Sequence, residues 1–196
     1  MVRACACRGV VLARAYALRM LMLDPRSHAT ADLAPGRLPV CWEWQAFADL
    51  TPAALYAALA LRADVFVVEQ GCPFQDLDGF DRQAEHLFGW HALQQPEREL
   101  VAYLRLIAPG GKYDEPSIGR VITARPYRER GLGRLAMHEA LDRAARRYPG
   151  LPVRISAQSR LQRFYASLGF VQASAPYMED GIPHIQMVRE AHRTPS

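Results

Sequence analysis

The feature that most constrains this chain is an apolar segment that runs through a glycine-bearing turn into a helix, Ser117–Arg134. Backbone N–H groups at a helix start lack intrahelical acceptors, and the helix dipole adds partial positive charge there. Gly131 and Gly133 have no Cβ, so a bulky anion can approach the main chain closely. The segment therefore predicts a strand, Ser117–Thr123, followed by a turn that binds a phosphate.

The spacing of these glycines excludes two common phosphate-binding motifs. A dinucleotide-binding turn needs a third glycine, and a P-loop needs a Lys-Ser/Thr pair after its last glycine. Here Arg134 and Leu135 follow Gly133, so neither motif is present. The pattern is instead Arg-x-x-Gly-x-Gly, beginning at Arg128.

The net positive charge of the 196-residue chain lies at its start. The formal net charge is +4, and residues 1–40 account for it with six arginines and two acidic residues. The rest of the chain has 18 basic and 18 acidic residues, hence no basic field of the kind that attracts nucleic acid. We interpret residues 1–40 as a disordered extension, a leader or a start site placed too early, and residues 41–196 as one globular domain.

Membrane insertion and metal binding are not expected either. No run of about 18 apolar residues is present, which argues against a membrane-spanning helix. The four cysteines form no Cys-x-x-Cys pair and no zinc-type spacing with histidine, which indicates free thiols in a reducing cytoplasm. We interpret Cys72 as structural rather than nucleophilic.

Hydrophobic periodicity in residues 41–196 predicts a single α+β domain around a mixed sheet. The expected strands are Cys41–Phe47, Glu85–Leu93, Leu100–Ile107, Ser117–Thr123, Pro152–Ala157, one starting at Phe170-Val171, and Ile185–Val188. The expected helices run from Thr51-Pro52 to about Val65–Val68, over Gly131–Tyr148, and over Leu161–Leu168. On the second helix, Glu139–Arg143 and Asp142–Arg146 have the i, i+4 spacing of ion pairs.

A second motif follows the glycine turn by about 30 residues. It consists of Gln158, a short helix containing Tyr165, and Gly169-Phe170. Without the turn upstream, Tyr165 would be interpreted as a core aromatic residue and Gly169 as a helix cap.

Taken together, the two motifs resemble the GNAT superfamily of N-acetyltransferases. Leu61–Asp81 and Glu179–Ile185 further resemble its ElaA-type branch. The resemblance covers about residues 41–190 and does not include the first forty. It implies a mostly antiparallel mixed sheet flanked by helices and splayed between its fourth and fifth strands. It also implies transfer of an acetyl group from acetyl-CoA to a primary amine by direct attack, without a metal or an acyl-enzyme.

The resemblance assigns roles to individual residues. The main chain at the glycine turn would hold the CoA pyrophosphate, helped by the side chains of Arg128 and Arg134; the turn consists of Arg128, Glu129, Arg130, Gly131, Leu132, Gly133 and Arg134. The backbone of Val121, Ile122 and Thr123 would pair with the pantetheine arm. Gln158 stands at the position of a family amide, and Tyr165 would protonate the departing thiolate.

The chain departs from a common family arrangement at Val153, where some relatives have a glutamate. The general base is therefore unassigned. Glu69, Asp76, Asp78 and His86 are candidates, and the alternatives are that each only organises its loop or that a water relay moves the proton. The absent glutamate leaves a second function open, a non-catalytic acyl-CoA sensor or interaction module on the same fold. The identity of the amine, a small molecule or a peptide, and a homodimeric state are also open.

Overall fold

The computed structural model describes residues 38–92 and 98–191. The expectations for residues 1–37 lie outside that range. The strands are β1 (Val40–Ala46), β2 (Ala84–Ala92), β3 (Arg98–Ile107), β4 (Ser117–Thr123), β5 (Val153–Gln158), β6 (Val171–Gln172), β7 (Tyr177–Glu179) and β8 (Ile182–Arg189). The main helices are α1 (Pro52–Arg62), α2 (Leu132–Arg147) and α3 (Gln162–Ala166), and a π-helical segment, η2 (Ala63–Glu69), continues α1. Short 3₁₀ turns are η1 (Phe47–Asp49), η3 (Phe80–Gln83), η4 (Arg125–Tyr127) and η5 (Ser159–Leu161).

The strands form one sheet in the order β1-β2-β3-β4-β5-β8-β6, and β7 pairs with β8. Every pairing is antiparallel except that of β4 with β5. Those two strands are parallel and share a single register pair, Ser117 with Arg154, before they diverge. The predicted splay between the fourth and fifth strands is therefore confirmed.

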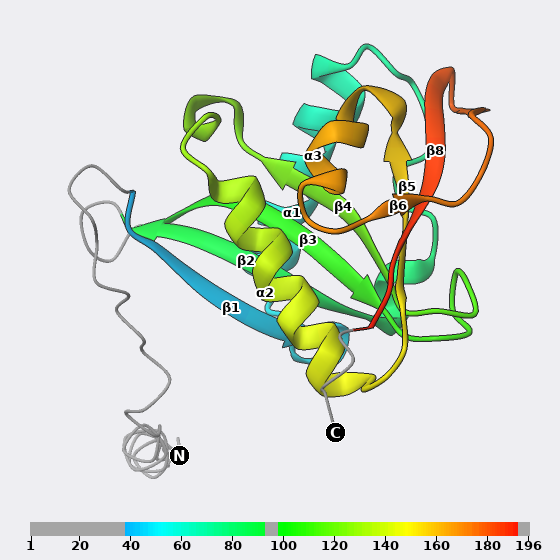
Figure 1. The fold of residues 1–196 in the computed structure, drawn as a ribbon. Coiled ribbons are helices and arrows are strands. Elements are labelled where there is room, and N and C mark those ends of the chain that lie inside the picture. The colour runs from blue at the N-terminus through cyan, green and yellow to red at the C-terminus, as the bar shows by residue number, and fades with distance from the viewer. Residues whose placement is uncertain (1–37, 93–97, 192–196) are drawn as a thin grey trace, which may run out of the picture. The chain divides into compact units, whose positions relative to one another are not determined.

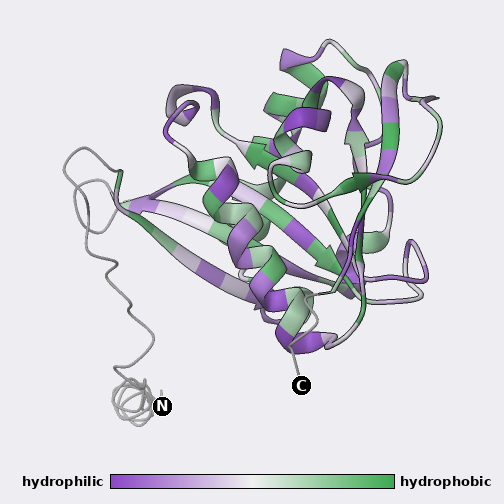
Figure 2. Ribbon diagram, in the orientation of Figure 1, coloured by the Kyte–Doolittle hydropathy of each residue, from purple (hydrophilic) through white to green (hydrophobic). Residues whose placement is uncertain are grey.

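Helices cover both faces of the sheet, with α2 across one face and α1 behind the other (Figure 1). The α2 side contains the larger core, in which Met137 and Leu141 pack with Leu104, Ile118 and Ile155. The α1 side contains a second core around Phe88, Tyr103 and Ile122. Apolar and polar residues alternate along α2, as expected of a helix with one buried face (Figure 2).

The first helix begins where the sequence predicts. Thr51 caps it, because its Oγ1 accepts a hydrogen bond from the Ala54 N–H at 3.1 Å, and Pro52 occupies the first turn. Beyond Arg62 the chain stays helical but widens into the π-helical η2, which ends at Glu69. This extension brings the residues after α1 to the splayed region of the sheet, where Glu69 contacts the turn before α2.

The ion pairs expected along α2 are not formed among the described residues. Arg143 and Arg147 both donate to Glu85 of β2 instead, through Nε at 2.6 and 2.8 Å respectively. Glu85 lies beside the helix with its side chain only 13% exposed, and the two arginines share its carboxylate. The i, i+4 prediction is therefore wrong for Arg143.

Candidate functional site

The divergence of β4 and β5 opens a cavity of about 660 Å³. Residues of both strands line it, as do η2, the glycine turn, α3 and the β7–β8 hairpin. Of the residues predicted from the sequence, those on its wall are Glu69, Val121, Ile122, Thr123, Arg128, Glu129, Gly133, Gln158 and Tyr165. The remaining turn residues, Arg130, Gly131, Leu132 and Arg134, adjoin it in sequence but do not line it.

The turn before α2 presents a run of free N–H groups. The N–H groups of Arg134 and Leu135 donate to the Gly131 carbonyl at 3.1 Å. Within the part of the chain that the structure describes, the four N–H groups before them, of residues 130–133, have no backbone acceptor. Glu129 and Gly131 have positive φ angles of 64° and 77°, so the backbone alternates in handedness as it does in anion-binding nests. The turn thus has the geometry of an anion site at a helix start.

Gly133 borders the cavity, and there is space for a Cβ at this position. A Cβ added there would lie 3.6 Å from Thr123 Oγ1 and 3.8 Å from the Phe164 ring, both ordinary contact distances. The fold therefore tolerates a small side chain at this position, and the absence of one leaves room on the cavity side. Leu132 has the opposite role, since its side chain is buried against Val101 and Ala102 and anchors the turn to the sheet.

The two arginines expected to bind phosphate already have protein partners. Arg128 donates to both oxygens of Glu69, at 2.5 and 2.8 Å, and its Nε donates to the Thr123 carbonyl at 3.1 Å. This hydrogen bonding lowers the pKa of Glu69. Arg134 donates to Ser167 Oγ at 2.9 Å and lies over the Phe164 ring. Arg128 must therefore rearrange or share its donors to bind a further anion, whereas Arg134 commits a single donor to Ser167 among the described residues.

Tyr165 is both a core residue and a cavity residue. Its ring packs against Phe164 and Phe170, with centroids 5.0 and 6.0 Å away, and only 6% of the residue is exposed. Burial raises the pKa of Tyr165 to about 12, so its hydroxyl is protonated at neutral pH. Gly169, with a φ of 87°, ends the short helix, and the Phe170 N–H returns to the Tyr165 carbonyl at 3.1 Å. The cap interpretation of Gly169 is confirmed, and it fixes Tyr165 against the cavity wall.

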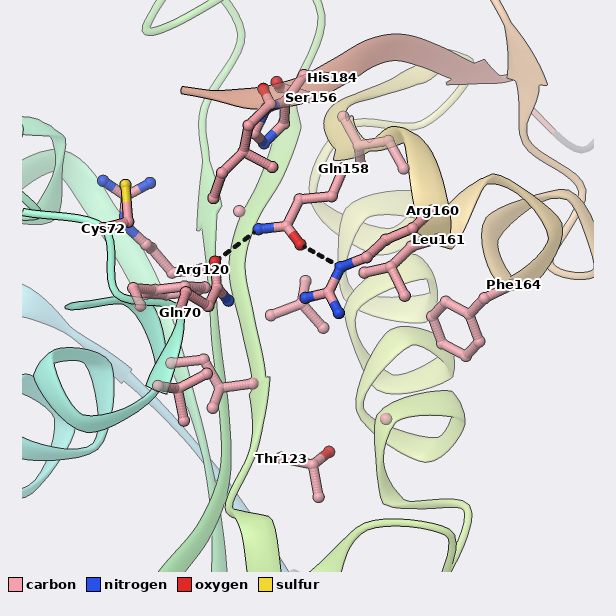
Figure 3. Close-up of a pocket in the computed structure, with 18 of the residues that line it drawn as sticks. Gln70, Cys72, Arg120, Thr123, Ser156, Gln158, Arg160, Leu161, Phe164 and His184 are labelled. Atoms are coloured by element: carbon pink, nitrogen blue, oxygen red, sulfur yellow. Dashed lines mark hydrogen bonds between the residues drawn. The ribbon is translucent and has the colours of Figure 1, made fainter. Parts of the chain in front are cut away.

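Gln158 connects the two sides of the cavity (Figure 3). Its Nε2 donates to Gln70 Oε1 at 2.9 Å, and its Oε1 accepts from Arg160 Nε at 2.9 Å. Gln70 directly follows η2, so this amide joins β5 to the segment after α1. The Arg128–Glu69 pair is a second contact across the cavity, and it joins the glycine turn to η2.

Three of the four candidate bases lie elsewhere. Asp76 and Asp78 belong to a buried ionic network with Asp81 and the arginines at positions 62, 105 and 120. Neither aspartate lines the main cavity, and both carboxylates are held by guanidinium groups. His86 is 1% exposed and is bonded through both ring nitrogens, to the Tyr103 hydroxyl at 2.6 Å and the Asp81 carbonyl at 2.9 Å. These three residues are structural, which corrects their candidacy as bases; only Glu69 faces the cavity.

The ionic network also shapes β4. Arg120 has a φ of 54°, unusual for a residue with a Cβ, at the point where the β3–β4 register shifts. Its Nε donates to Asp76 Oδ1 at 2.6 Å and its Nη2 to the Asp76 carbonyl at 2.8 Å. These bonds hold a bulge in the strand that borders the cavity.

Sequence reasoning missed a polar cluster at the other end of the cavity, which consists of Ser156, Tyr177, Glu179 and His184. Ser156 Oγ donates to Glu179 Oε2 at 2.7 Å and lies 2.6 Å from the Tyr177 hydroxyl. Burial acts to raise the pKa of Glu179, but the bond from Ser156 and nearby positive charge outweigh it and lower that pKa. The alternation of polar and apolar residues in Val153–Gln158 indicates that Ser156 lies on a polar face of its strand. It does not predict that β8 pairs with β5 and brings His184 to the same face.

Residues 38–92 and 98–191 contain neither a metal-binding cluster nor a membrane-spanning helix. No group of three or more His, Cys, Asp or Glu residues there is arranged to hold a metal ion. No helix in that part of the chain is long and apolar enough to cross a membrane.

Comparison with known proteins places this geometry in a family. A model described as "Acetyltransferase (GNAT) domain" matches residues 81–191. The chain is 44% identical over 151 residues to a UPF0039 protein of Synechocystis, covering 77% of this chain and 96% of the relative. It is 42% identical over 152 residues to the protein ElaA of Escherichia coli, covering 76% of this chain and 96% of that protein.

Solved structures agree. An acyl-CoA N-acyltransferase from Pseudomonas aeruginosa is 43% identical with a TM-score of 0.72, over 77% of this chain and 99% of that one. Escherichia coli ElaA is 40% identical with a TM-score of 0.70, over 78% of this chain and all of that one. The sequence matches and the sheet splayed between β4 and β5 establish that this chain belongs to the GNAT superfamily, in its ElaA-type branch.

Proposed function

We propose that the protein is an N-acetyltransferase that moves the acetyl group of acetyl-CoA to a primary amine by direct attack. The observation that carries the proposal is one cavity lined by the divergent edge of β4, by Tyr165 and by Gly133 of the turn, whose N–H group has no backbone acceptor. The family match supports acyl transfer from an acyl-CoA in general. The acetyl group and the primary amine are our more specific assignments.

The turn is suited to the pyrophosphate of acetyl-CoA. The N–H groups of residues 130–133 have no backbone acceptor, and the helix dipole adds partial positive charge at the start of α2. Each charge-assisted hydrogen bond to phosphate contributes about 1.5–3 kcal/mol. Arg128 would add its charge on leaving Glu69.

The edge of β4 that faces β5 is suited to the pantetheine arm. Ile122 and Thr123 pair with β3 on their other side, while β5 meets β4 only at Ser117. The free edge can therefore accept an extended chain as an added strand. A β4 N–H group beside the thioester carbonyl would stabilise the oxyanion that forms on attack, and removal of such a donor typically costs about 2.7–4 kcal/mol.

Tyr165 is suited to protonate the leaving thiolate. Its hydroxyl stays protonated at neutral pH because burial raises its pKa to about 12. It lines the cavity from α3.

The test combines binding and turnover on the full chain. Isothermal titration with acetyl-CoA is expected to show sub-millimolar binding, and a thiol-release assay with a panel of amines is expected to show turnover. Tyr165→Phe keeps the ring packing and is expected to lower kcat with little change in the acetyl-CoA Kd. No binding would refute the proposal, and undiminished turnover by Tyr165→Phe would remove the assigned proton donor.

One observation favours a second function, a non-catalytic acyl-CoA sensor. Val153 stands at the position where some relatives have a glutamate; it is 6% exposed and belongs to the apolar core. Strand β5 therefore has no carboxylate at the position of that glutamate. Binding of acetyl-CoA without thiol release from any amine would support the sensor.

A further inference from the structure

The cavity wall at β5 and β8 contains a histidine whose second ring nitrogen is uncommitted. His184 lies opposite Gln158 in the β5–β8 register, and Ser156 lies opposite Gln186. Because side chains alternate across a strand, these four share one face of the sheet, while Ile155, Ala157 and Ile185 are buried on the other. Figure 3 shows the imidazole beside Ser156 at the end of the cavity away from Thr123. His184 therefore faces the cavity from the end opposite the glycine turn.

A hydrogen bond decides which nitrogen of His184 carries the proton. Nδ1 lies 2.8 Å from the Ile182 carbonyl, which can only accept. Nδ1 therefore donates, and in the neutral ring the lone pair is on Nε2. No described residue makes a hydrogen bond to Nε2. The bond to Ile182 also fixes the ring orientation, since both residues belong to β8.

The other titratable groups around His184 are bonded to protein partners or carry their protons. Glu179 of β7 accepts from Ser156, and its pKa is lowered. Lys112 lies 3.6 Å from Glu179, and Arg120 of β4 is bonded to Asp76. Tyr177 of β7, with its ring centroid 6.2 Å from that of His184, is protonated at neutral pH because burial raises its pKa. Nε2 is thus the basic atom that the cluster leaves available.

We propose that His184 is the general base of the reaction, with Nε2 taking a proton from the acceptor ammonium group; this rests on the proposed acetyl transfer. The ammonium group gives one proton to Nε2, and the freed nitrogen lone pair attacks the thioester carbonyl carbon. The C–N bond forms and the C–S bond breaks, and the thiolate takes the proton of Tyr165. The second amine proton then returns to the Tyr165 oxygen, and the imidazolium releases its proton to solvent. Glu179, an anion on the same wall, favours the ammonium substrate.

The decisive variant is His184→Asn, because the asparagine amide nitrogen takes the place of Nδ1 and keeps the bond to the Ile182 carbonyl while Nε2 is lost. General bases contribute about 10²–10⁴-fold, so we expect kcat at pH 7 to fall by at least about 100-fold with the acetyl-CoA Kd unchanged. The loss is expected to shrink toward pH 10, because alkyl amines with a pKa of about 10.4 then lose their proton unaided. His184→Gln is the second variant should the first not fold, and it is expected to show the same pH-dependent loss.

The matched control is His91→Asn. His91 also donates through Nδ1 to a carbonyl, that of Pro39 at 3.0 Å, but it does not line the cavity, so unchanged turnover is expected. Full activity in His184→Asn, or a loss that is equal at all pH values, would overturn the base assignment while leaving acetyl transfer intact. Binding of acetyl-CoA without turnover by the unmodified chain would overturn both.

Discussion

The buried ionic network offers the sharpest test of the structural interpretation of the 76–81 loop. Asp81 is 8% exposed and accepts from Arg62 Nη1 and Arg105 Nη1, each at 2.8 Å. Both arginines are 1% exposed, so neither can turn to water without unfolding its surroundings. Asp81→Asn removes the charge between them while keeping the size of the side chain.

The expected cost follows from these contacts. Two charge-assisted hydrogen bonds are worth about 1.5–3 kcal/mol each, and breaking a buried ion pair on one side typically costs about 3–5 kcal/mol. Arg62 keeps Asp76, Arg105 keeps Asp78, and the asparagine oxygen in the place of Oδ1 can still accept from both as a neutral acceptor. We therefore expect the low end, a loss of about 3 kcal/mol in the free energy of unfolding.

Urea denaturation at pH 7 measures this loss. With a slope of about 2 kcal/mol per M, the midpoint is expected to fall by about 1.5 M. Asp142→Asn, at an exposed position on α2, is the control and should change stability by less than about 0.5 kcal/mol. A loss below about 1 kcal/mol for Asp81→Asn would show that the network does not stabilise the loop and would reopen the question of what its aspartates do.

Three further predictions follow from the site and its supports. Glu69→Gln frees the guanidinium of Arg128 and removes a carboxylate that faces the phosphate turn. Titration calorimetry should show acetyl-CoA bound about 1.4–5-fold tighter, which corresponds to about 0.2–1 kcal/mol for a partly exposed pair. Glu43→Gln breaks a similarly exposed pair outside the cavity and should not change the Kd. Burial acts to raise the pKa of Asp78, but the hydrogen bonds and charges of its arginines lower it to about 2. Because an aspartate in the unfolded chain has a pKa of about 3.9, Asp78 stabilises the folded state above pH 4, and this stabilisation should be lost between about pH 4 and 2. Urea midpoints that stay constant over that range would contradict this. Gly131→Ala strains a residue with a φ of 77° and should cost about 1–2 kcal/mol and weaken acetyl-CoA binding, whereas Gly150→Ala, with a φ of 78° after α2, should cost a similar amount without affecting binding.

The elements that local signals specify were predicted well. The cap formed by Thr51, the strand Ser117–Thr123, the helix after Gly131 and the stop at Gly169 all lie where the sequence indicates them. Each depends on residues within a few positions, because capping bonds, glycine conformations and strand alternation are local properties. The splay between the fourth and fifth strands came from the family resemblance, since no local pattern encodes it.

Side-chain roles that depend on distant partners were not predicted. Asp76 and Asp78 were candidate bases or organisers of their loop, and the arginines that they pair with lie up to 44 residues away. Arg143 resembled a partner for Glu139 and instead contacts Glu85. In each case the partner is the group that the fold brings within hydrogen-bond distance, and only the packed chain defines which group that is.

The sequence by itself therefore determined the elements, the glycine turn and membership of the family, because these follow from short spacings and recognisable segments. The tertiary structure decided which polar groups face the cavity. It removed Asp76, Asp78 and His86 from the wall and brought Ser156 of β5, Glu179 of β7 and His184 of β8 together on it. The physical reason is register: pairing β8 against β5 by one residue more or less would turn His184 into the core and leave the cavity without its imidazole.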